Sequence, residues 1–262
     1  MIEATPKKQL GQHWLFDEHS LDAMVASAEV TEGDLVLEVG PGLGTLTKRL
    51  LLAKAQVWAL EYDKSLIPAL SKKFASYDKQ FHIENVDILQ YDFDTPPSGY
   101  KIVANIPYYL TSNLLRKMCE ATNPFSKSAL LVQKEVAERV CAQPGDMSIL
   151  SVSVQFYCHV HLGDLVPASL FTPPPKVDSQ ILILEHRQKP LFDGVDADLF
   201  FKLVKAGFAQ KRKKLKTSLG QGLAMSKDQI GDLLDSANID GNLRAQALSL
   251  DDWYKLYLSY LS

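Results

Sequence analysis

The amino-acid sequence predicts an α/β fold with a mostly parallel sheet and an antiparallel edge pair, followed by a small all-helical domain. Three observations lead to this prediction. Short apolar runs alternate with helical ones from about residue 34 to residue 142, which is typical of parallel strands joined by helical crossovers. Two further β-like runs follow with little helix between them. Beyond residue 185 the chain has no strong strand pattern.

The first two strand–helix units lie in residues 34–75. Residues 34–39, DLVLEV, form an apolar run of strand length, and residues 43–53 have the apolar spacing of a helix. Residues 56–61, QVWALE, are again a predicted strand and residues 65–75 a predicted helix. A strand–helix–strand connection within one sheet is almost always right-handed and joins parallel strands. We therefore expect these strands to be parallel neighbours.

The remaining strands of the first domain follow the same alternation. Residues 81–87, 101–106 and 128–133 are predicted strands, and residues 111–121 and 134–142 are predicted helices. The runs LSVSVQFYC (150–158) and SQILILE (179–185) are expected to form the antiparallel edge pair. Residues 186–198, HRQKPLFDGVDAD, have the composition of a linker. The predicted domains are therefore residues 1–187 and residues 188–262.

Composition excludes several classes of protein. The chain has 262 residues, of which 46% are hydrophobic and 23% charged, as is usual for a globular protein with a large core. Its three cysteines are far apart and form no CxxC pair, which argues against a zinc cluster or a disulfide framework. No apolar stretch is long enough for a membrane span, and residues 1–10 have no signal-peptide features. A cytoplasmic protein without a metal is expected, as a monomer.

A glycine-rich turn connects the first predicted strand to its helix. Its spacing is Gly40-x-Gly42-x-Gly44, with Thr45 where a dinucleotide fingerprint requires glycine or alanine. Glu38 comes just before the first glycine and would repel a pyrophosphate. A ligand with a cationic amine and no phosphate fits this charge better, and S-adenosylmethionine is such a ligand. The sequence therefore favours an adenosyl cofactor over a nicotinamide one.

Two more acids lie at the ends of the next strands. Glu61 ends the strand QVWALE, about twenty residues after the glycine turn, where an acid can accept from both ribose hydroxyls. Asp87 follows the next strand, within reach of an adenine amine. The carboxyl ends of parallel strands meet at one sheet edge, so Glu38, Glu61 and Asp87 are expected to surround one ligand.

The segment NIPYYL (105–110) follows the strand KIVA at the same edge. The exocyclic amine of a base is a poor nucleophile because its lone pair is delocalised into the ring. The side-chain oxygen of Asn105 and a backbone carbonyl can accept the two hydrogens of this amine and direct its lone pair at the methyl group of S-adenosylmethionine. Pro107 holds the turn, and Tyr108 offers a face for an unstacked base. These residues predict methyl transfer to an amine of a base.

Six motifs together resemble those of the ribosomal RNA adenine dimethyltransferase family. They are KKQLGQHWL (7–15), EVGPGLGTLT (38–47), NIPYYL (105–110), LVQKEVAERV (131–140), FTPPPKVDS (171–179) and FAQKRKKLKTSL (208–219). The resemblance implies a Rossmann-like methyltransferase sheet in residues 1–187 and an RNA-binding helical domain in residues 188–262. It also implies dimethylation of two adjacent adenines in a hairpin near the 3′ end of small-subunit (16S) rRNA, with a role in small-subunit maturation.

The resemblance also assigns roles to individual positions. His13, Leu15, Gly40, Glu61, Asp87 and Asn105 would line the S-adenosylmethionine site. Asn105, Tyr108 and Phe171 would hold the target adenine, with Phe171 on its second face. The chain departs from the family at His13, where many members have asparagine, and at Tyr109 and Thr111, where asparagine and serine are usual. The stretch YGRLS, common in the family, reads DMSILS here.

Residues 201–219 carry seven cations and no acid. Four of these cations are consecutive, namely Lys211, Arg212, Lys213 and Lys214. Such a run can be a solvated helix face. In a chain with net charge −3, however, its concentration in one segment indicates phosphate contact. Lys7 and Lys8 are expected to add to the same surface.

Two alternative functions remain from the sequence. One is a large-subunit rRNA adenine methyltransferase that confers antibiotic resistance, against which FTPPPKVDS and the long C-terminal domain argue. The other is a non-catalytic ribosome-assembly or RNA-binding factor. The intact glycine turn, Glu61 and NIPY argue that catalysis is retained.

Overall fold

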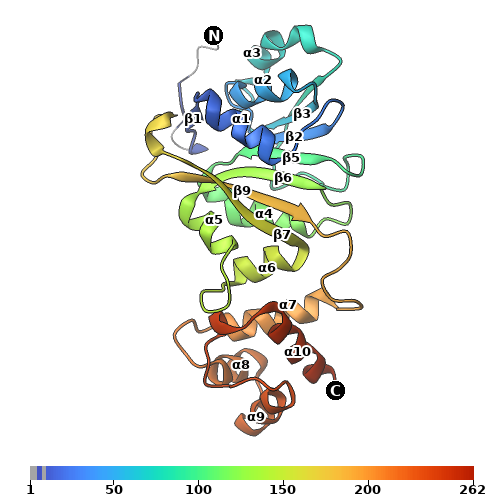
Figure 1. The fold of residues 1–262 in the computed structure, drawn as a ribbon, viewed down its shortest axis with the longest axis vertical. Coiled ribbons are helices and arrows are strands. Elements are labelled where there is room, and N and C mark those ends of the chain that lie inside the picture. Colours follow the sequence, from blue (N-terminus) through green and yellow to red (C-terminus); the bar gives the residue numbers. More distant parts are fainter. Residues whose placement is uncertain (1–4, 8–9) are drawn as a thin grey trace. The chain divides into compact units, whose positions relative to one another are not determined.

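The structure is a computed structural model that describes residues 5–7 and 10–262 (Figure 1). The chain divides into two compact units. The first unit contains the residues up to Ala137 together with Cys158–His186, and the second contains Glu138–Tyr157 and Arg187–Ser262. The division expected after residue 187 lies next to the third of the three points at which the chain passes between the units. It differs for residues 138–157, which belong to the helical unit.

The described part of the first unit is built on a seven-stranded sheet with the order β4-β3-β2-β5-β6-β9-β7. The five parallel strands are β2 (Leu35–Val39), β3 (Gln56–Glu61), β4 (Phe81–Asn85), β5 (Lys101–Asn105) and β6 (Lys127–Gln133). Strand β9 (Ser179–His186) runs antiparallel to both β6 and the edge strand β7 (Cys158–Val166). The predicted, mostly parallel sheet with antiparallel strands at one side is confirmed.

Helices cover both faces of this sheet (Figure 1). On one face, α1 (Glu18–Ser27), α2 (Thr45–Leu52) and α3 (Ile67–Lys73) share a core with the strands, in which Met24, Leu50 and Leu70 are fully buried. The helices α4 (Thr111–Cys119) and α5 (Lys134–Val140) follow β5 and β6. The order of the strands reverses between β2 and β5, and α/β sheets bind ligands at such a point.

A second, two-stranded sheet joins the N-terminal region to the FTPPPKVDS segment. Strand β1 (Trp14–Leu15) pairs antiparallel with β8 (Phe171–Thr172), with Leu15 opposite Phe171. This pairing brings residues about 160 positions apart side by side. Short 3-10 helices occupy Ala75–Tyr77, Tyr108–Leu110, Ala168–Leu170 and Ala245–Ala247.

The predicted strand at residues 150–158 is wrong. These residues form most of helix α6 (Ile149–Tyr157), and the edge strand begins only at Cys158. The alternation of valine and serine resembles a strand pattern, but Val152 and Phe156 lie one helical turn apart and both enter the core of the helical unit. Ser148 begins the helix, because its Oγ accepts a hydrogen bond from the Ser151 N–H.

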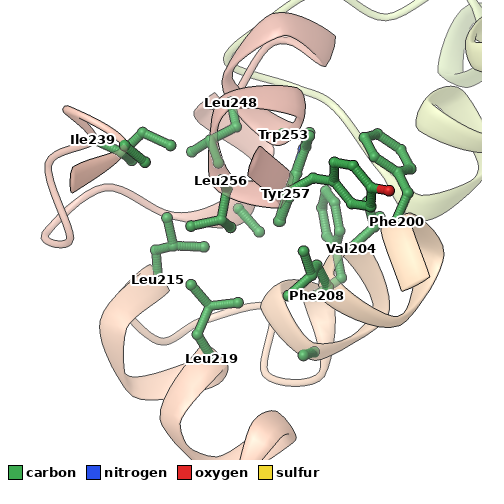
Figure 2. Close-up of a cluster of buried hydrophobic side chains, with 14 of the residues drawn as sticks. Phe200, Val204, Phe208, Leu215, Leu219, Ile239, Leu248, Trp253, Leu256 and Tyr257 are labelled. Carbon is green, nitrogen blue, oxygen red and sulfur yellow. The ribbon is translucent and has the colours of Figure 1, made fainter. Parts of the chain in front are cut away.

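The second unit packs α6 with α7 (Ala197–Phe208), α8 (Leu215–Leu223), α9 (Lys227–Ser236) and α10 (Leu250–Leu261). Figure 2 shows its core, in which Phe200, Val204 and Trp253 are fully buried. The glycine at position 207 of α7 allows Trp253 of α10 to pack closely, because a Cβ at this position would collide with the Trp253 ring. The helical C-terminal part expected from the sequence is present.

In the part of the chain that the structure describes, no helix has the length and apolar character needed to cross a membrane.

Candidate active site

A cavity of about 340 Å³ lies at the carboxyl ends of four adjacent strands of the first unit. Its walls come from the residues that follow β2, β3, β4 and β5, and from residues 10–15. The strand order makes these segments neighbours, so acids and amides that are distant in sequence converge here. The cavity spans the point between β2 and β5 where the strand order reverses, which is the expected ligand position in such a sheet.

The glycine turn forms one wall of the cavity. Gly40, Gly42 and Gly44 have φ values of 68°, 56° and 70°, a region that residues with a Cβ rarely adopt. A Cβ at Gly40 would meet nothing within 4 Å, so free space adjoins the backbone there. Lys73 supports the other end of the turn, because its Nζ donates to the carbonyl oxygens of Leu43 (2.6 Å) and Gly44 (3.2 Å). This lysine was not singled out from the sequence.

Glu61 joins the ends of β2 and β3. Its Oε2 accepts a hydrogen bond from the Gly42 N–H (3.1 Å), and its Oε1 accepts one from the Asp63 N–H (2.7 Å). The side chain is only 5% exposed. Burial raises the pKa of Glu61, and these two backbone bonds act in the opposite direction. Each oxygen retains further acceptor capacity, so the role toward two ribose hydroxyls remains a prediction that this geometry permits.

Asp87 lies on the loop after β4 and lines the same cavity. One carboxylate oxygen, Oδ1, accepts a hydrogen bond from the Leu89 N–H at 2.9 Å. This bond fixes the side chain and leaves the other oxygen as an acceptor for a ligand amine.

Glu38 also belongs to the cavity lining, but its carboxyl group is 1% exposed. Neither carboxyl oxygen has a hydrogen-bond partner among the described residues. Burial raises the pKa of Glu38 to about 8, against the opposing effect of nearby Thr47. The carboxyl group is therefore mostly protonated at neutral pH, whereas the sequence alone suggested a negative charge.

Asn105 ends β5 with its side-chain amide held in one orientation. Its Nδ2 donates to the backbone carbonyl oxygen of His13 at 3.1 Å. The amide nitrogen is thereby used within the protein, and the side-chain oxygen stays as an acceptor at the cavity. This supporting contact comes from the N-terminal segment and has no signal in the NIPY motif itself.

Tyr108 and His13 lie next to each other in the cavity wall. Their rings are stacked, with 6.0 Å between centroids and 21° between planes. The Tyr108 hydroxyl shares a 2.7 Å hydrogen bond with Oγ of Ser179, and Nδ1 of His13 donates to the Pro173 carbonyl oxygen at 2.7 Å. Both rings are thus fixed by residues of the FTPPPKVDS segment, a use of Ser179 that the sequence did not reveal.

Leu15 lines the cavity as expected, but Phe171 does not belong to the described lining residues. Phe171 is 3% exposed and packs into the same core cluster as Leu15, its partner in the β1–β8 pair. Its ring is covered by the protein, so in this conformation it offers no face to a base. The structure therefore does not bring Phe171 together with Asn105 and Tyr108.

Two tyrosines at the cavity edge were not assigned a role from the sequence. Tyr62 and Tyr109 are 61% and 62% exposed, and both line the cavity. Tyr109 had been noted only as a departure from the family pattern. A signal was available, because each tyrosine follows the last residues of a strand that ends at the cavity.

The basic residues Lys211, Arg212, Lys213 and Lys214 lie in the turn between α7 and α8, not on a helix face. All four are exposed. Only Lys214 among them has a side-chain partner in the described part of the chain, since its Nζ donates to Oδ1 of Asn242 at 3.0 Å. This basic turn (residues 211–214) therefore presents largely uncompensated charge.

Of the two N-terminal lysines expected to add to the basic surface, Lys7 has its partners within the first unit. The Nζ of Lys7 forms an ion pair with Asp63 (2.7 Å) and donates to Oγ of Ser65 (2.9 Å). Both partners belong to the first unit. Lys8 lies outside the described residues.

Comparison with known proteins decides the family. A protein-family model described as ribosomal RNA adenine dimethylase matches residues 4–261. The chain belongs to this family. The recognition made from the motifs is thereby confirmed, as is the expectation of an rRNA adenine methyltransferase with a Rossmann-like sheet.

Curated relatives match over nearly the whole chain. A protein of Dehalococcoides mccartyi (strain CBDB1) named ribosomal RNA small subunit methyltransferase A is 44% identical over 97% of this chain and 88% of its own length. A protein of the same name from Clostridioides difficile is 40% identical over 94% of this chain and 88% of its own length.

Solved structures show the same fold. A dimethyladenosine transferase from Plasmodium falciparum superposes with a TM-score of 0.82 at 27% identity, covering 95% of this chain and 98% of that one. The 23S rRNA methyltransferase ErmE superposes with a TM-score of 0.75 at 26% identity, covering 95% of this chain and 100% of that one. The structurally similar proteins thus include one named for 23S rRNA and one named only as a dimethyladenosine transferase.

Proposed function

We propose that the protein uses S-adenosylmethionine to dimethylate the exocyclic N6 of two adjacent adenines in a hairpin near the 3′ end of small-subunit rRNA. The observation that carries the proposal is the convergence of Glu61, Asp87 and Asn105 on one cavity in a chain of this family. The choice of the small subunit rests on the curated relatives of this chain, which carry the name ribosomal RNA small subunit methyltransferase A.

The residues of the cavity fit S-adenosylmethionine. The backbone next to Gly40 adjoins free space, which suits close approach of a ligand to the glycine turn. Glu61 and Asp87 supply carboxylate acceptors for the ribose hydroxyls and the adenine amine. His13 and Leu15 complete the wall on the N-terminal side. When bound, this cofactor supplies an electrophilic methyl group.

Asn105 prepares the attacking amine. Its Nδ2 is held by the His13 carbonyl, so its side-chain oxygen is left to accept a hydrogen from the adenine N6. When the Asn105 oxygen accepts an amine hydrogen, the nitrogen lone pair points away from the hydrogens and the amine leaves the plane of the ring more easily. Because the amine becomes positively charged as the new bond forms, an oriented acceptor stabilises the transition state more than the ground state. The product can lose its proton to water, so no general base is required.

Tyr108 supplies a surface for the target base. Its hydroxyl is tied to Ser179 and its ring lies beside His13, so the aromatic face is preorganised before the substrate arrives. Stacking a base on an aromatic side chain contributes about 1–3 kcal/mol. A hairpin loop offers adenines that are already unpaired, which lowers the free energy needed to extrude them. Phe171 would need a change of conformation to contact the base.

The basic turn is the proposed contact with rRNA phosphates. Its exposed cations would attract RNA without reading its sequence, so they would position the substrate and leave specificity to the cavity. We infer that the partner is the small ribosomal subunit and that the enzyme acts on it in the cytoplasm as a monomer.

The alternative of a large-subunit methyltransferase has one observation in its favour, the similarity to ErmE. The identity to that structure, 26%, is well below the identity to the curated relatives. The curated relatives, at 44% and 40% identity, favour the small subunit. A purely structural assembly factor would have no need for the oriented Asn105 amide.

Transfer of radiolabelled methyl groups tests the proposal. The protein should methylate small subunits that lack the two dimethyladenosines, and large subunits or naked rRNA should receive little label. Labelling of large subunits alone would establish the alternative, and no labelling of any substrate would favour the non-catalytic role.

The variant Asn105→Ala tests the mechanism in the same assay. It should lower single-turnover methylation by about two to three orders of magnitude, as expected for loss of one transition-state acceptor. Its affinity for the small subunit should stay unchanged, because the contact is used at the reacting amine. Methylation at the wild-type rate would contradict the proposed role. Thr111→Ser, near the motif but without an assigned role, serves as the control.

A further inference from the structure

Glu38 combines three properties that the proposed mechanism does not use. It lines the cofactor cavity, it is 1% exposed, and neither of its carboxyl oxygens has a hydrogen-bond partner in the described part of the chain. A buried carboxylate without partners is strongly disfavoured relative to its neutral form. The empty site therefore contains an acid that holds its proton because burial outweighs the opposing effects of Thr47 and Lys73 on its pKa.

The groups around Glu38 act on its pKa in both directions, and burial has the largest effect. Glu61 at the end of β3 is a second buried acid, and its nearby charge raises the pKa of Glu38 further, after burial itself. Thr47 on α2 acts in the opposite direction. Lys73 on α3 also favours the charged form, but its ammonium group is bound to the Leu43 and Gly44 carbonyl oxygens. The pKa of Glu38 is about 8, so at pH 7 most of the molecules carry the proton.

A cation in the cavity changes this balance. Charges interact strongly at a buried site because the effective dielectric constant is lower than in water. The Glu38 oxygens are covered by the protein, so the carboxylate acts on a bound cation through space and not by direct contact. A positive group a few ångströms away stabilises the carboxylate through space, and the carboxylate in turn stabilises the bound cation.

We propose that Glu38 is a proton-exchanging counter-ion of the cofactor site, which is neutral in the empty protein and releases its proton when a cationic adenosyl ligand binds. This inference rests on the proposed use of S-adenosylmethionine. The released proton passes to solvent, so binding is coupled to pH. Below the pKa of the empty state, affinity for the cationic ligand should rise by up to about tenfold per pH unit, and above it the affinity should level off.

The coupling distinguishes ligands by charge. Adenosine fills the adenine and ribose part of the site but carries neither a sulfonium nor an ammonium group. It should therefore bind without releasing the Glu38 proton. S-adenosylhomocysteine has the ammonium group and no sulfonium, so its proton release shows which of the two cations acts on Glu38.

Calorimetry of S-adenosylmethionine binding to the full chain in phosphate and in Tris at pH 7 measures the protons released. The wild-type protein should release at least about half a proton more than Glu38→Gln, whose side chain has a similar shape and no proton to lose. The excess should be clearly smaller at pH 9, where a larger share of Glu38 is already ionised in the empty protein. The exposed-acid variant Glu32→Gln should behave as the wild type.

The result separates this inference from the proposed function. Tight binding with equal proton release in wild type and Glu38→Gln would overturn the inference and leave the cofactor assignment intact. No binding of S-adenosylmethionine at any pH would remove the proposed cofactor, and the inference with it. If Glu38→Gln does not fold, the wild-type protein decides at pH 6 to 7, where the ligand's ammonium group keeps its own proton, because absence of proton release there also contradicts the inference.

Discussion

Replacing Glu38 with glutamine should make the stability of the ligand-free protein less sensitive to pH. Glutamine keeps the shape of the side chain and remains neutral at every pH, so the variant removes one titration and little else. The buried amide adds a constant difference in stability. The informative quantity is therefore how the difference between wild type and variant changes with pH.

The size of the effect follows from the two pKa values of Glu38. In the unfolded chain the value is the ordinary 4.5, and in the folded protein it is about 8. Because the folded pKa is the higher one, this group's contribution to stability is fully present below pH 4.5 and is lost as pH rises through 8. The full shift corresponds to about 5 kcal/mol, of which about 3 kcal/mol is lost between pH 6 and pH 9.

Chemical unfolding of both proteins at pH 6, 7, 8 and 9 measures this difference. The free energy of unfolding of the wild type should fall relative to Glu38→Gln by about 3 kcal/mol over the range, which is a shift of several degrees in Tm for a unit of this size. Glu32→Gln, which removes an exposed acid, should follow the wild type at every pH. Parallel curves for wild type and Glu38→Gln would refute the claim that Glu38 is protonated when the cavity is empty.

Three further predictions test other contacts. In thermal unfolding, Gly44→Ala should destabilise the protein by about 1–3 kcal/mol more than Gly40→Ala. Both positions have a positive φ, but only at Gly44 does the new Cβ collide with Phe74. Equal losses would show that packing under the turn is unimportant. Tyr108→Phe should lower the free energy of unfolding by about 1–3 kcal/mol, because it leaves the buried Ser179 hydroxyl unpaired. RNA affinity should stay nearly unchanged, since the aromatic ring remains. A loss of RNA affinity without a loss of stability would contradict the assignment of the hydroxyl to stability and of the ring to RNA binding. Neutralising residues 211–214 together should reduce the slope of log affinity for small subunits against log salt concentration by up to about 0.7–0.9 per lost phosphate contact. The affinity for S-adenosylmethionine should stay unchanged. An unchanged salt slope would place the RNA contact elsewhere.

Local patterns in the sequence were sufficient for most of the first unit. The bounds of β3 were predicted without error, and the other parallel strands within one or two residues, because a parallel strand buried on both faces is a nearly continuous apolar run. The glycine turn, Glu61, Asp87 and Asn105 were found for a related reason. Each lies directly after such a run, and parallel strands bring their carboxyl ends to one edge.

Helix α6 shows where local pattern is insufficient. Its valines and serines alternate as in a half-buried strand, but Val152 and Phe156 pack into the core of the helical unit as neighbours on one helix face. The same segment moves residues 138–157 out of the first unit. Long-range packing decides between helix and strand when the local preference of a short apolar run is weak.

The chemical state of the site was decided by the tertiary structure. The sequence by itself determined that Glu61, Asp87 and Asn105 reach the cavity, because each follows directly after a strand pattern and the carboxyl ends of parallel strands share one edge. Only the tertiary structure decided that Glu38 is buried and neutral, that the His13 carbonyl orients the Asn105 amide, and that Phe171 is covered by core residues. Burial and hydrogen bonding depend on which distant segments meet, here above all the β1–β8 pair, and no pattern within a single motif contains that information.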